Sequence, residues 1–274
     1  MTSGQARASS DWLTLREPAD AAARAADLVA ELRSVLPADG VVAVRDLGCG
    51  TGSMARWLAG RLSGPQHWVM FDRDDELLTL AATDRPDTAA DGAPVTIETR
   101  QRDITRLDPE ELAGASLITA SALLDMLTAV ELERLVAACV RAGCPVLIAL
   151  SVTGHVDLEP VDPFDRRVAD AFNAHQRRST AGGTLLGPDA FAAAVDAFTR
   201  LGVEVAVRPT PWRLGPGQAA LAGEWFTGWL SAACEQQPEL RAEAHEYARR
   251  RLAQAADGRL SVTVHHQDLL ARPS

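Results

Sequence analysis

"VRDLGCGTGSM", residues 44–54, is the stretch from which the fold of this chain can be worked out. The apolar run at 41–47 predicts a buried strand, and the run SMARWLAGRL at 53–62 predicts a helix. Between them, glycines at every second position from 48 to 52 form a turn that can bring the backbone close to a ligand. The nature of that ligand has to be inferred from the residues around the turn.

Strand and helix patterns alternate along the rest of the chain. Apolar or alternating runs predict seven strands, at 41–47, 67–72, 95–103, 116–121, 144–152, 203–209 and 259–268. Helical spacing of apolar residues predicts a helix before the first strand, at 19–36, and helices between later strands, including 187–202, 217–235 and 238–256. This alternation is typical of an α/β fold with a doubly wound, mostly parallel sheet, whose last two strands can pair antiparallel at one edge.

The same pattern divides the chain into five segments. We expect a flexible N-terminus (1–12), a helical segment folded over the ligand site (13–40), an α/β core (41–210), inserted helices (211–258) and a final edge strand with a tail (259–274). We expect the inserted helices either to cap the site or to form a homodimer interface. Trp225, Phe226 and Trp229 crowd the first of these helices and either pack in the core or the interface, or line an aromatic pocket.

The composition argues against several partners and locations. The formal net charge of -10 disfavours nucleic acid, whose phosphates would be repelled. The first residues lack the apolar core of a secretory signal, and no apolar run is long enough to span a bilayer. We therefore expect a cytoplasmic protein with no membrane partner. Its four cysteines show no CxxC pair or metal-ligand spacing, which predicts reduced thiols and no metal site.

Phosphate-binding interpretations of the glycine turn fit the sequence poorly. A P-loop needs a lysine that reaches the phosphates, and all 27 basic residues of this chain are arginines. The dinucleotide motif GxGxxG would need its third glycine where Ser53 stands. Asp46, Asp72 and Asp103 each lie at the end of a predicted strand. Ligands of doubly wound sheets bind at these ends, so the three carboxylates would repel a phosphate.

The three carboxylates suit a ligand with hydroxyl, amine and ammonium groups. Asp72 lies 24 residues after Gly48 and can accept hydrogen bonds from both hydroxyls of a ribose. Asp103 can accept one from an exocyclic amine such as adenine N6, and Asp46 can face an ammonium group. Ribose, adenine and ammonium without phosphate describe S-adenosylmethionine. Taken singly, each carboxylate has an alternative role as a helix cap.

Four segments in order, VRDLGCGTGSM, FDRD, RDIT and TASALLDML, resemble the ligand-binding motifs of class I S-adenosylmethionine-dependent methyltransferases across roughly residues 13–210. The resemblance implies a Rossmann-like methyltransferase fold, S-adenosyl-L-methionine as cofactor and S-adenosyl-L-homocysteine as product. It implies that Asp46 and the 48–52 turn hold the methionine portion and that Asp72 bonds the ribose. The cofactor-binding residues expected are Arg16, Asp46, Gly48, Cys49, Gly50, Gly52, Asp72 and Arg73, with Asp103 and Ile104 around the adenine and Ser121 on the methionine side.

Arg16 precedes the apolar-periodic part of the first predicted helix. N-terminal segments of this kind can fold over a cofactor, and an arginine there could pair bidentately with the methionine carboxylate. The alternative is an ordinary surface arginine.

The sequence indicates the methyl acceptor less clearly than it indicates the cofactor. Methyltransferases that act on base amines resemble one another in carrying an (Asp/Asn)-Pro-Pro-(Tyr/Phe) run at the fourth strand, where this chain has TASALLD. With no aromatic stacking residue nearby, a nucleic-acid acceptor is disfavoured. We expect a small-molecule acceptor that is methylated on an oxygen or nitrogen atom. The acidic loop expected at 154–165 could attract a cationic or amine acceptor.

Two histidines are candidates for a catalytic base. His155 follows the fifth predicted strand, and His175 lies on the apolar face of a predicted helix. Each has a structural alternative, as a loop histidine bonded to backbone or as a packed side chain, and positioning alone can suffice for methyl transfer. Two other functions stay open: an NAD(P)-dependent Rossmann oxidoreductase, which could not use the common Tyr-x-x-x-Lys pair, and a cofactor-binding protein without catalysis.

Overall fold

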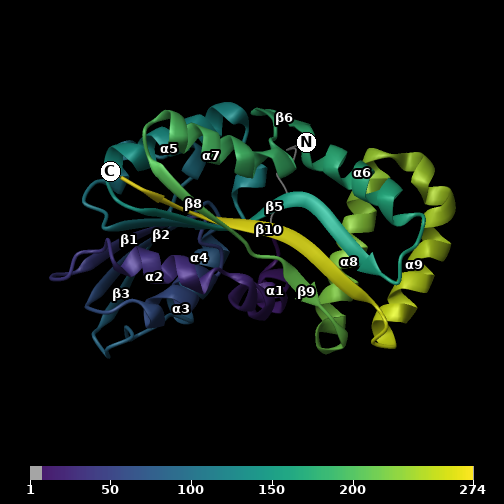
Figure 1. The fold of residues 1–274 in the computed structure, drawn as a ribbon, viewed down its shortest axis with the longest axis horizontal. Coiled ribbons are helices and arrows are strands. Elements are labelled where there is room, and N and C mark those ends of the chain that lie inside the picture. Colours follow the sequence, from purple (N-terminus) through teal and green to yellow (C-terminus); the bar gives the residue numbers. More distant parts are fainter. Residues whose placement is uncertain (1–7, 274) are drawn as a thin grey trace.

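A computed structural model of the chain describes residues 8–273 and is built around one mixed sheet (Figure 1). The order of the strands is β3-β2-β1-β4-β5-β10-β8, and the first five run parallel. β10 is antiparallel to both of its neighbours. The bounds are β1 Val42–Leu47, β2 Gln66–Asp72, β3 Val95–Gln101, β4 Leu117–Ser121, β5 Val146–Glu159, β8 Glu204–Pro209 and β10 Ser261–Arg272. The expected α/β fold with a mostly parallel seven-stranded sheet is confirmed.

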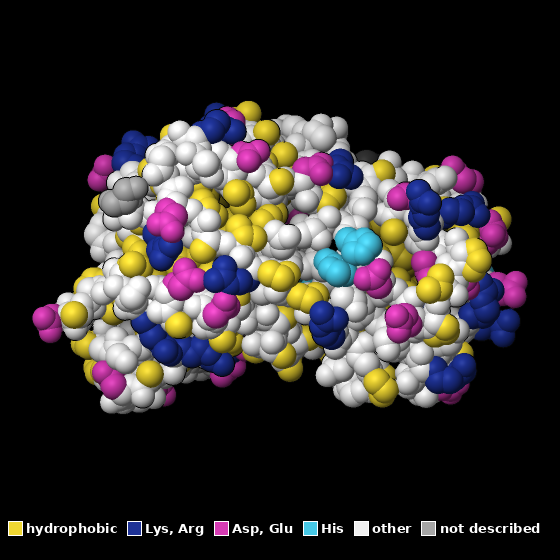
Figure 2. Space-filling model, viewed as in Figure 1, with side chains coloured by type: hydrophobic (Ala, Val, Ile, Leu, Met, Phe, Trp, Pro, Cys, Tyr) yellow, Lys and Arg dark blue, Asp and Glu magenta, His cyan; other side chains and the backbone are white. Residues whose placement is uncertain are grey.

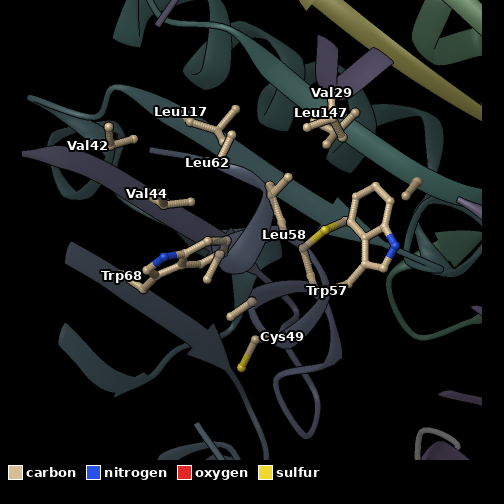
Figure 3. Close-up of a cluster of buried hydrophobic side chains, with 14 of the residues drawn as sticks. Val29, Val42, Val44, Cys49, Trp57, Leu58, Leu62, Trp68, Leu117 and Leu147 are labelled. Atoms are coloured by element: carbon tan, nitrogen blue, oxygen red, sulfur yellow. The ribbon is translucent and has the colours of Figure 1, made fainter. Parts of the chain in front are cut away.

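Helices cover both faces of this sheet (Figure 1). One face packs against α2 (Ala26–Arg33), α3 (Ser53–Leu58) and α4 (Asp75–Thr83), and the other against α5 (Ala129–Ala142) and α7 (Ala190–Arg200). Figure 3 shows the first face, where Trp68 of β2 and Val44 of β1 point toward Leu58 of α3. Burial of these apolar side chains is the main force that holds the helices to the sheet.

A second group of helices forms a lobe at one end of the sheet. α6 (Asp165–Gln176), α8 (Ala219–Gln236) and α9 (Arg241–Ala256) gather there, where β5 and β10 extend beyond the other strands (Figure 1). A short strand, β9 (Trp212–Leu214), pairs with residues 262–264 near the start of β10. Phe226 and Trp229 are buried in the core of this lobe, and Trp225 stacks on Trp229 with 5.2 Å between ring centroids.

The N-terminal helix expected at 19–36 is wrong in its extent. The chain forms two helices, α1 (Ser10–Ala23) and α2, with a break at Arg24 and Ala25. Arg24 leaves the helical conformation, and its guanidinium enters the interior, where it donates to the carbonyl and hydroxyl oxygens of Ser53 and to the hydroxyl of Ser121. Periodicity alone gave no sign of the break, because alanine and leucine continue on both sides of it.

The fifth strand is longer than expected, and the acidic loop predicted at 154–165 is wrong for residues 154–159. β5 continues through Glu159, and its second half pairs with the start of β10, with Ser261 opposite Glu159. His155, Asp157 and Glu159 are exposed, and Leu158 between them is buried. This part is therefore an amphipathic strand whose polar face gave it the composition of a loop.

The expected division into segments stays a prediction. The flexible N-terminus predicted for 1–12 lies mostly outside the described residues, and from Ser10 onward the chain is helical. α8 and α9 pack in the lobe, and the homodimer interface stays a prediction. Within residues 8–273, no helix combines the length and hydrophobicity needed to cross a bilayer.

Asp268 in β10 joins three parts of the chain in the interior. Its carboxylate accepts hydrogen bonds from the N–H of Leu150 (2.7 Å), the N–H of Ala25 (3.0 Å) and the hydroxyl of Thr210 (2.7 Å). These partners come from β5, from the break between α1 and α2, and from the segment after β8. Only 1% of Asp268 is exposed, so water does not replace the carboxylate as acceptor.

Replacing Asp268 by alanine should lower the free energy of unfolding by about 3 kcal/mol or more. Three buried donors would lose their acceptor, and each unsatisfied group costs about 1–3 kcal/mol. Urea denaturation followed by circular dichroism measures the change. Ser261→Ala, at an exposed position of the same strand, is the control and should stay within about 0.5 kcal/mol of the unmodified protein. An equally small change for Asp268→Ala would contradict the role assigned to this carboxylate.

Candidate functional site

A cavity of about 440 Å³ lies beyond the carboxyl ends of strands β1 to β4, where doubly wound sheets bind their ligands. Its volume is within the range of small-molecule sites. Five regions supply its wall: α1, the glycine turn, the ends of β2 and β3, the segment after β4, and the hairpin of β6 (Ser179–Thr180) and β7 (Gly183–Thr184). Ten of the eleven expected cofactor residues line it: Arg16, Asp46, Gly48, Cys49, Gly50, Asp72, Arg73, Asp103, Ile104 and Ser121.

The glycine turn adopts a backbone conformation that residues with side chains would strain or clash in. Gly48 and Gly50 have positive φ angles of 65° and 54°. A Cβ atom on Gly48 would lie 2.9 Å from Cδ1 of Leu123 in the cavity wall. Gly52 does not line the cavity; with a φ of 85° it begins α3 and lets this helix approach Ala81 of α4. At Gly48 and Gly50 the main chain therefore lines the cavity without a side chain in front of it. Gly52 instead allows α3 to pack closely against α4.

Asp72 both shapes the turn and lines the cavity. One carboxylate oxygen accepts from the N–H of Gly50 at 2.9 Å, and the other accepts from the N–H of Asp74 at 2.9 Å. Each carboxylate oxygen can accept a second hydrogen bond. Asp72 can therefore hold the turn and still bind the hydroxyls of a ribose.

Asp46 is a buried carboxylate with one unsatisfied oxygen. Oδ1 accepts from the hydroxyl of Thr119 at 2.7 Å, and Oδ2 is buried with no hydrogen-bond partner among the described residues. Burial raises the pKa of Asp46 to about 6, although Thr119 and the nearby Arg24 oppose the shift. A buried acceptor without a partner is costly, and an ammonium group in the cavity would satisfy it. The residues present thus fit the amino-acid portion of S-adenosylmethionine.

Asp103 caps a helix and also lines the cavity. It caps the short 3-10 helix that follows β3, accepting from the N–H and the hydroxyl of Thr105 at 3.0 and 2.8 Å. Its side chain is about half exposed and lines the cavity beside Ile104. The cap is present, and the adenine contact stays a prediction.

Arg16 lies over the cavity from α1, with its guanidinium already engaged. It donates to both oxygens of Asp20, at 2.9 and 3.1 Å, and its guanidinium carbon lies 4.9 Å from the ring centroid of Trp212. Trp212 donates its indole N–H to the same Asp20 carboxylate at 3.0 Å. The surface-arginine alternative is wrong, because Arg16 is largely buried, and the pairing with a ligand carboxylate stays a prediction.

Cys49, Arg73 and Ser121 complete the expected set. Burial raises the pKa of the Cys49 thiol, so this side chain is uncharged at neutral pH. Arg73 is exposed at the rim, and the hydroxyl of Ser121 accepts from Arg24 at 3.2 Å. Arg24 was not expected from the sequence, because at helical spacing its position does not share the face of Ala22, Ala25 and Val29.

Neither candidate histidine lines the cavity. His155 is on the exposed face of β5, with Nε2 3.2 Å from Asp157. His175 is half-buried in α6, and burial followed by the nearby Arg178 lowers its pKa. The structure therefore brings no support for a catalytic role of these two residues.

Asp125 is a carboxyl group in the cavity wall that the sequence analysis missed. It follows β4 in a 3-10 turn, within the segment TASALLDML. Burial raises the pKa of Asp125 to about 6, opposed by Arg16 and Arg178. The sequence did offer one signal for Asp125, its position shortly after the end of β4, because the loop after this strand borders the ligand site.

Comparisons with known proteins agree with this geometry. Residues 44–145 match a family model described as a methyltransferase domain. Among curated protein sequences, none matches the chain. A cyclopropane synthase from Mycobacterium tuberculosis is 14% identical, with 96% of this chain and 94% of that one covered and a TM-score of 0.52. A geranyl diphosphate C-methyltransferase from Streptomyces coelicolor is 12% identical, with 99% and 88% covered and a TM-score of 0.48. At 14% identity, the first likeness supports the fold.

The affinity for S-adenosylmethionine should fall when the pH drops through about 6. Asp46 is ionised above its pKa and neutral below it, so its attraction for the ligand ammonium is lost on the acid side, by about tenfold per pH unit at most. Asp46→Asn should bind more weakly by about 1.5–3 kcal/mol and lose this dependence. Calorimetric titration between pH 5 and 8 measures both effects. If the affinity of the Asp46→Asn variant depended on pH as strongly as that of the unmodified protein, the pH dependence would arise from another group.

Asp72→Ala should weaken cofactor binding by about 1–3 kcal/mol, because the turn loses the acceptor for the Gly50 N–H and the ribose loses its own. Titration with S-adenosylhomocysteine measures the change. Asp75→Ala, an exposed aspartate at the start of α4, is the matched control and should bind as the unmodified protein does. Equal affinities for both variants would leave Asp72 with a structural role only.

Proposed function

We propose that this chain, a class I S-adenosylmethionine-dependent methyltransferase, transfers the methyl group to an oxygen or nitrogen atom of a neutral or cationic small molecule. The observation that carries the proposal is the carboxyl group of Asp125, which lines the cavity outside the expected cofactor set. A proton leaves a hydroxyl or amine when it is methylated, and a carboxylate beside the acceptor can take it.

The cofactor half of the cavity is assigned to the strand ends. When bound, S-adenosylmethionine supplies an electrophilic methyl group on its sulfonium. Asp46 would hold the ammonium group through its unsatisfied oxygen, and Asp72 would hold the ribose hydroxyls. Asp103 and Ile104 would border the adenine. Because these groups sit on strand ends, the sheet keeps their spacing fixed.

The acceptor half is assigned to the segment after β4, α1 and the β6–β7 hairpin. Trp12, Met126 and Leu185 bring apolar surface to this part of the cavity wall from three different regions. Such a surface can exclude water and orient a small organic molecule, and orientation is the largest requirement of an in-line displacement. Asp125 would then accept a hydrogen bond from the acceptor hydroxyl or amine and fix which atom faces the methyl group.

The charge of the cavity wall narrows the acceptor class. Its acidic residues are Asp20, Asp46, Asp72, Asp74, Asp103, Asp125 and Glu131, and its basic residues are Arg16, Arg73 and Arg102. Asp20 neutralises Arg16, so the remaining balance is acidic. A phosphate-rich acceptor, nucleic acid included, would be repelled, while an amine or a neutral hydroxyl compound would not.

Asp125→Asn should reduce kcat by about 10²–10⁴-fold with little change in cofactor affinity, since the amide cannot take a proton. In the unmodified enzyme kcat should rise with pH through about 6, as Asp125 ionises, and the variant should lose this rise. The assay follows S-adenosylhomocysteine release with a panel of small amines, phenols and aliphatic alcohols.

Asp108→Asn is the matched control, because Asp108 is an aspartate outside the cavity wall that caps a 3-10 helix. It should keep the rate and the pH profile. An Asp125→Asn enzyme with the rate and pH profile of the control would contradict the role of this carboxyl. Activity confined to a carbon nucleophile would contradict transfer to oxygen or nitrogen.

A further inference from the structure

Two histidines and an aspartate converge on the exposed face of β5 and β10, outside the cavity wall. Nε2 of His265 lies 2.8 Å from Oδ2 of Asp157, and Nε2 of His155 lies 3.2 Å from Oδ1 of the same carboxylate. The two imidazole rings are 4.6 Å apart between centroids. Figure 2 shows histidine side chains in contact, beside an acidic side chain, on an open face of the molecule.

A bulge in β5 produces this convergence. Val264 pairs with Val156 and His266 pairs with Val152, so three residues of β5 stand opposite His265 alone. Bulges turn side chains into directions that a regular ladder would not allow. This one brings the His155 ring beside that of His265, a residue on the neighbouring strand.

The bulge is held by contacts that leave it little freedom. Gly154 has a φ of 76°, and a Cβ atom there would lie 2.7 Å from Cβ of Pro188. Asn173 of α6 donates its side-chain N–H to the Gly154 carbonyl at 2.8 Å. The hydroxyl of Thr153 donates to the His265 carbonyl at 3.2 Å. The backbone beneath the three side chains is therefore fixed before any ligand binds.

We propose that His155, Asp157 and His265 bind a divalent transition-metal ion, with Zn²⁺ as the first candidate. Each residue offers one ligand atom, and these atoms all lie within 4.8 Å of one another. Ligands at about 2.0–2.1 Å from a tetrahedral zinc ion are about 3.3 Å apart. The two nitrogen–oxygen distances, 2.8 and 3.2 Å to the two different oxygens of Asp157, are close to that spacing. Binding of one ion would require the three side chains to rotate toward a common point.

The residue types also select the class of metal. Imidazole nitrogen with one carboxylate suits zinc, nickel and copper better than calcium or magnesium, which prefer oxygen ligands. The exposed position leaves a fourth coordination place for water. Because the three ligands join β5 to β10 at the bulge, the ion would clamp the two strands that lead from the sheet into the lobe. The site serves stability and is independent of the proposed methyl acceptor.

The test is titration of the full-length, tag-free protein with ZnCl₂ after treatment with a chelator. We expect one ion per chain by calorimetry and a higher thermal midpoint with zinc. His155→Gln and His265→Gln should each weaken binding by at least about tenfold, since even the loss of a group behind a ligand has that effect. Titration with Co²⁺ should give the absorption bands of a nitrogen- and oxygen-bound ion.

His67→Gln is the matched control, because His67 is a partly exposed histidine on another strand, with Nε2 3.8 Å from a single carboxylate, Glu98. Its zinc affinity should equal that of the unmodified protein. Stoichiometric binding that survives in both the His155 and His265 variants would overturn the proposal, and so would the absence of zinc binding and of cobalt bands in the unmodified protein. The cobalt measurement needs no variant, so the proposal can fail even if a variant does not fold.

Discussion

The buried guanidinium of Arg24 is the interaction on which the arrangement of the site depends. Only 4% of this residue is exposed, and a charge removed from water must be compensated by partners. Arg24 donates to Ser53 at the start of α3 and to Ser121 at the end of β4, and the carboxylates of Asp20, Asp268 and Asp46 lie close enough to favour its charged form. One cation therefore ties the glycine turn to the fourth strand, and three buried carboxylates favour its charge.

The same residue explains how α1 comes to cover the cavity. For Arg24 to enter the interior, the chain must leave the helix there, and the break is held by the bond from the Ala25 N–H to Asp268. α1 then runs separately from α2 and brings Trp12 and Arg16 into the cavity wall. The salt bridge of Arg16 with Asp20 and the contact of both with Trp212 fasten this helix to the strands of the lobe. Helix α1, the glycine turn and the lobe are thus joined by one polar network.

Much of the fold and of the cofactor site follows from local patterns. The strand and helix periods give the α/β class, and parallel strands bring their carboxyl ends to one edge, so Asp46, Asp72 and Asp103 had to meet there. The errors share a cause. β5 was ended too early because the polar face of an amphipathic strand resembles a loop, and its partner β10 begins about a hundred residues later in the chain. Asp125 was missed because the residues of α1 and of the β6–β7 hairpin that share its cavity wall are far from it in sequence.

The sequence by itself determined the sheet, the glycine turn and the three strand-end carboxylates, and through them the class of the cofactor. These features depend on residues close together in the chain or on the general geometry of parallel sheets. The tertiary structure alone decided which arginine is buried, that Asp125 lines the cavity, and that His155 lies beside His265 instead of in the cavity. Each of these depends on partners far apart in sequence, as with Asp157 and His265, which are separated by 108 positions. Periodicity carries no information about such pairs, because it records which face of an element is buried and not what lies against it.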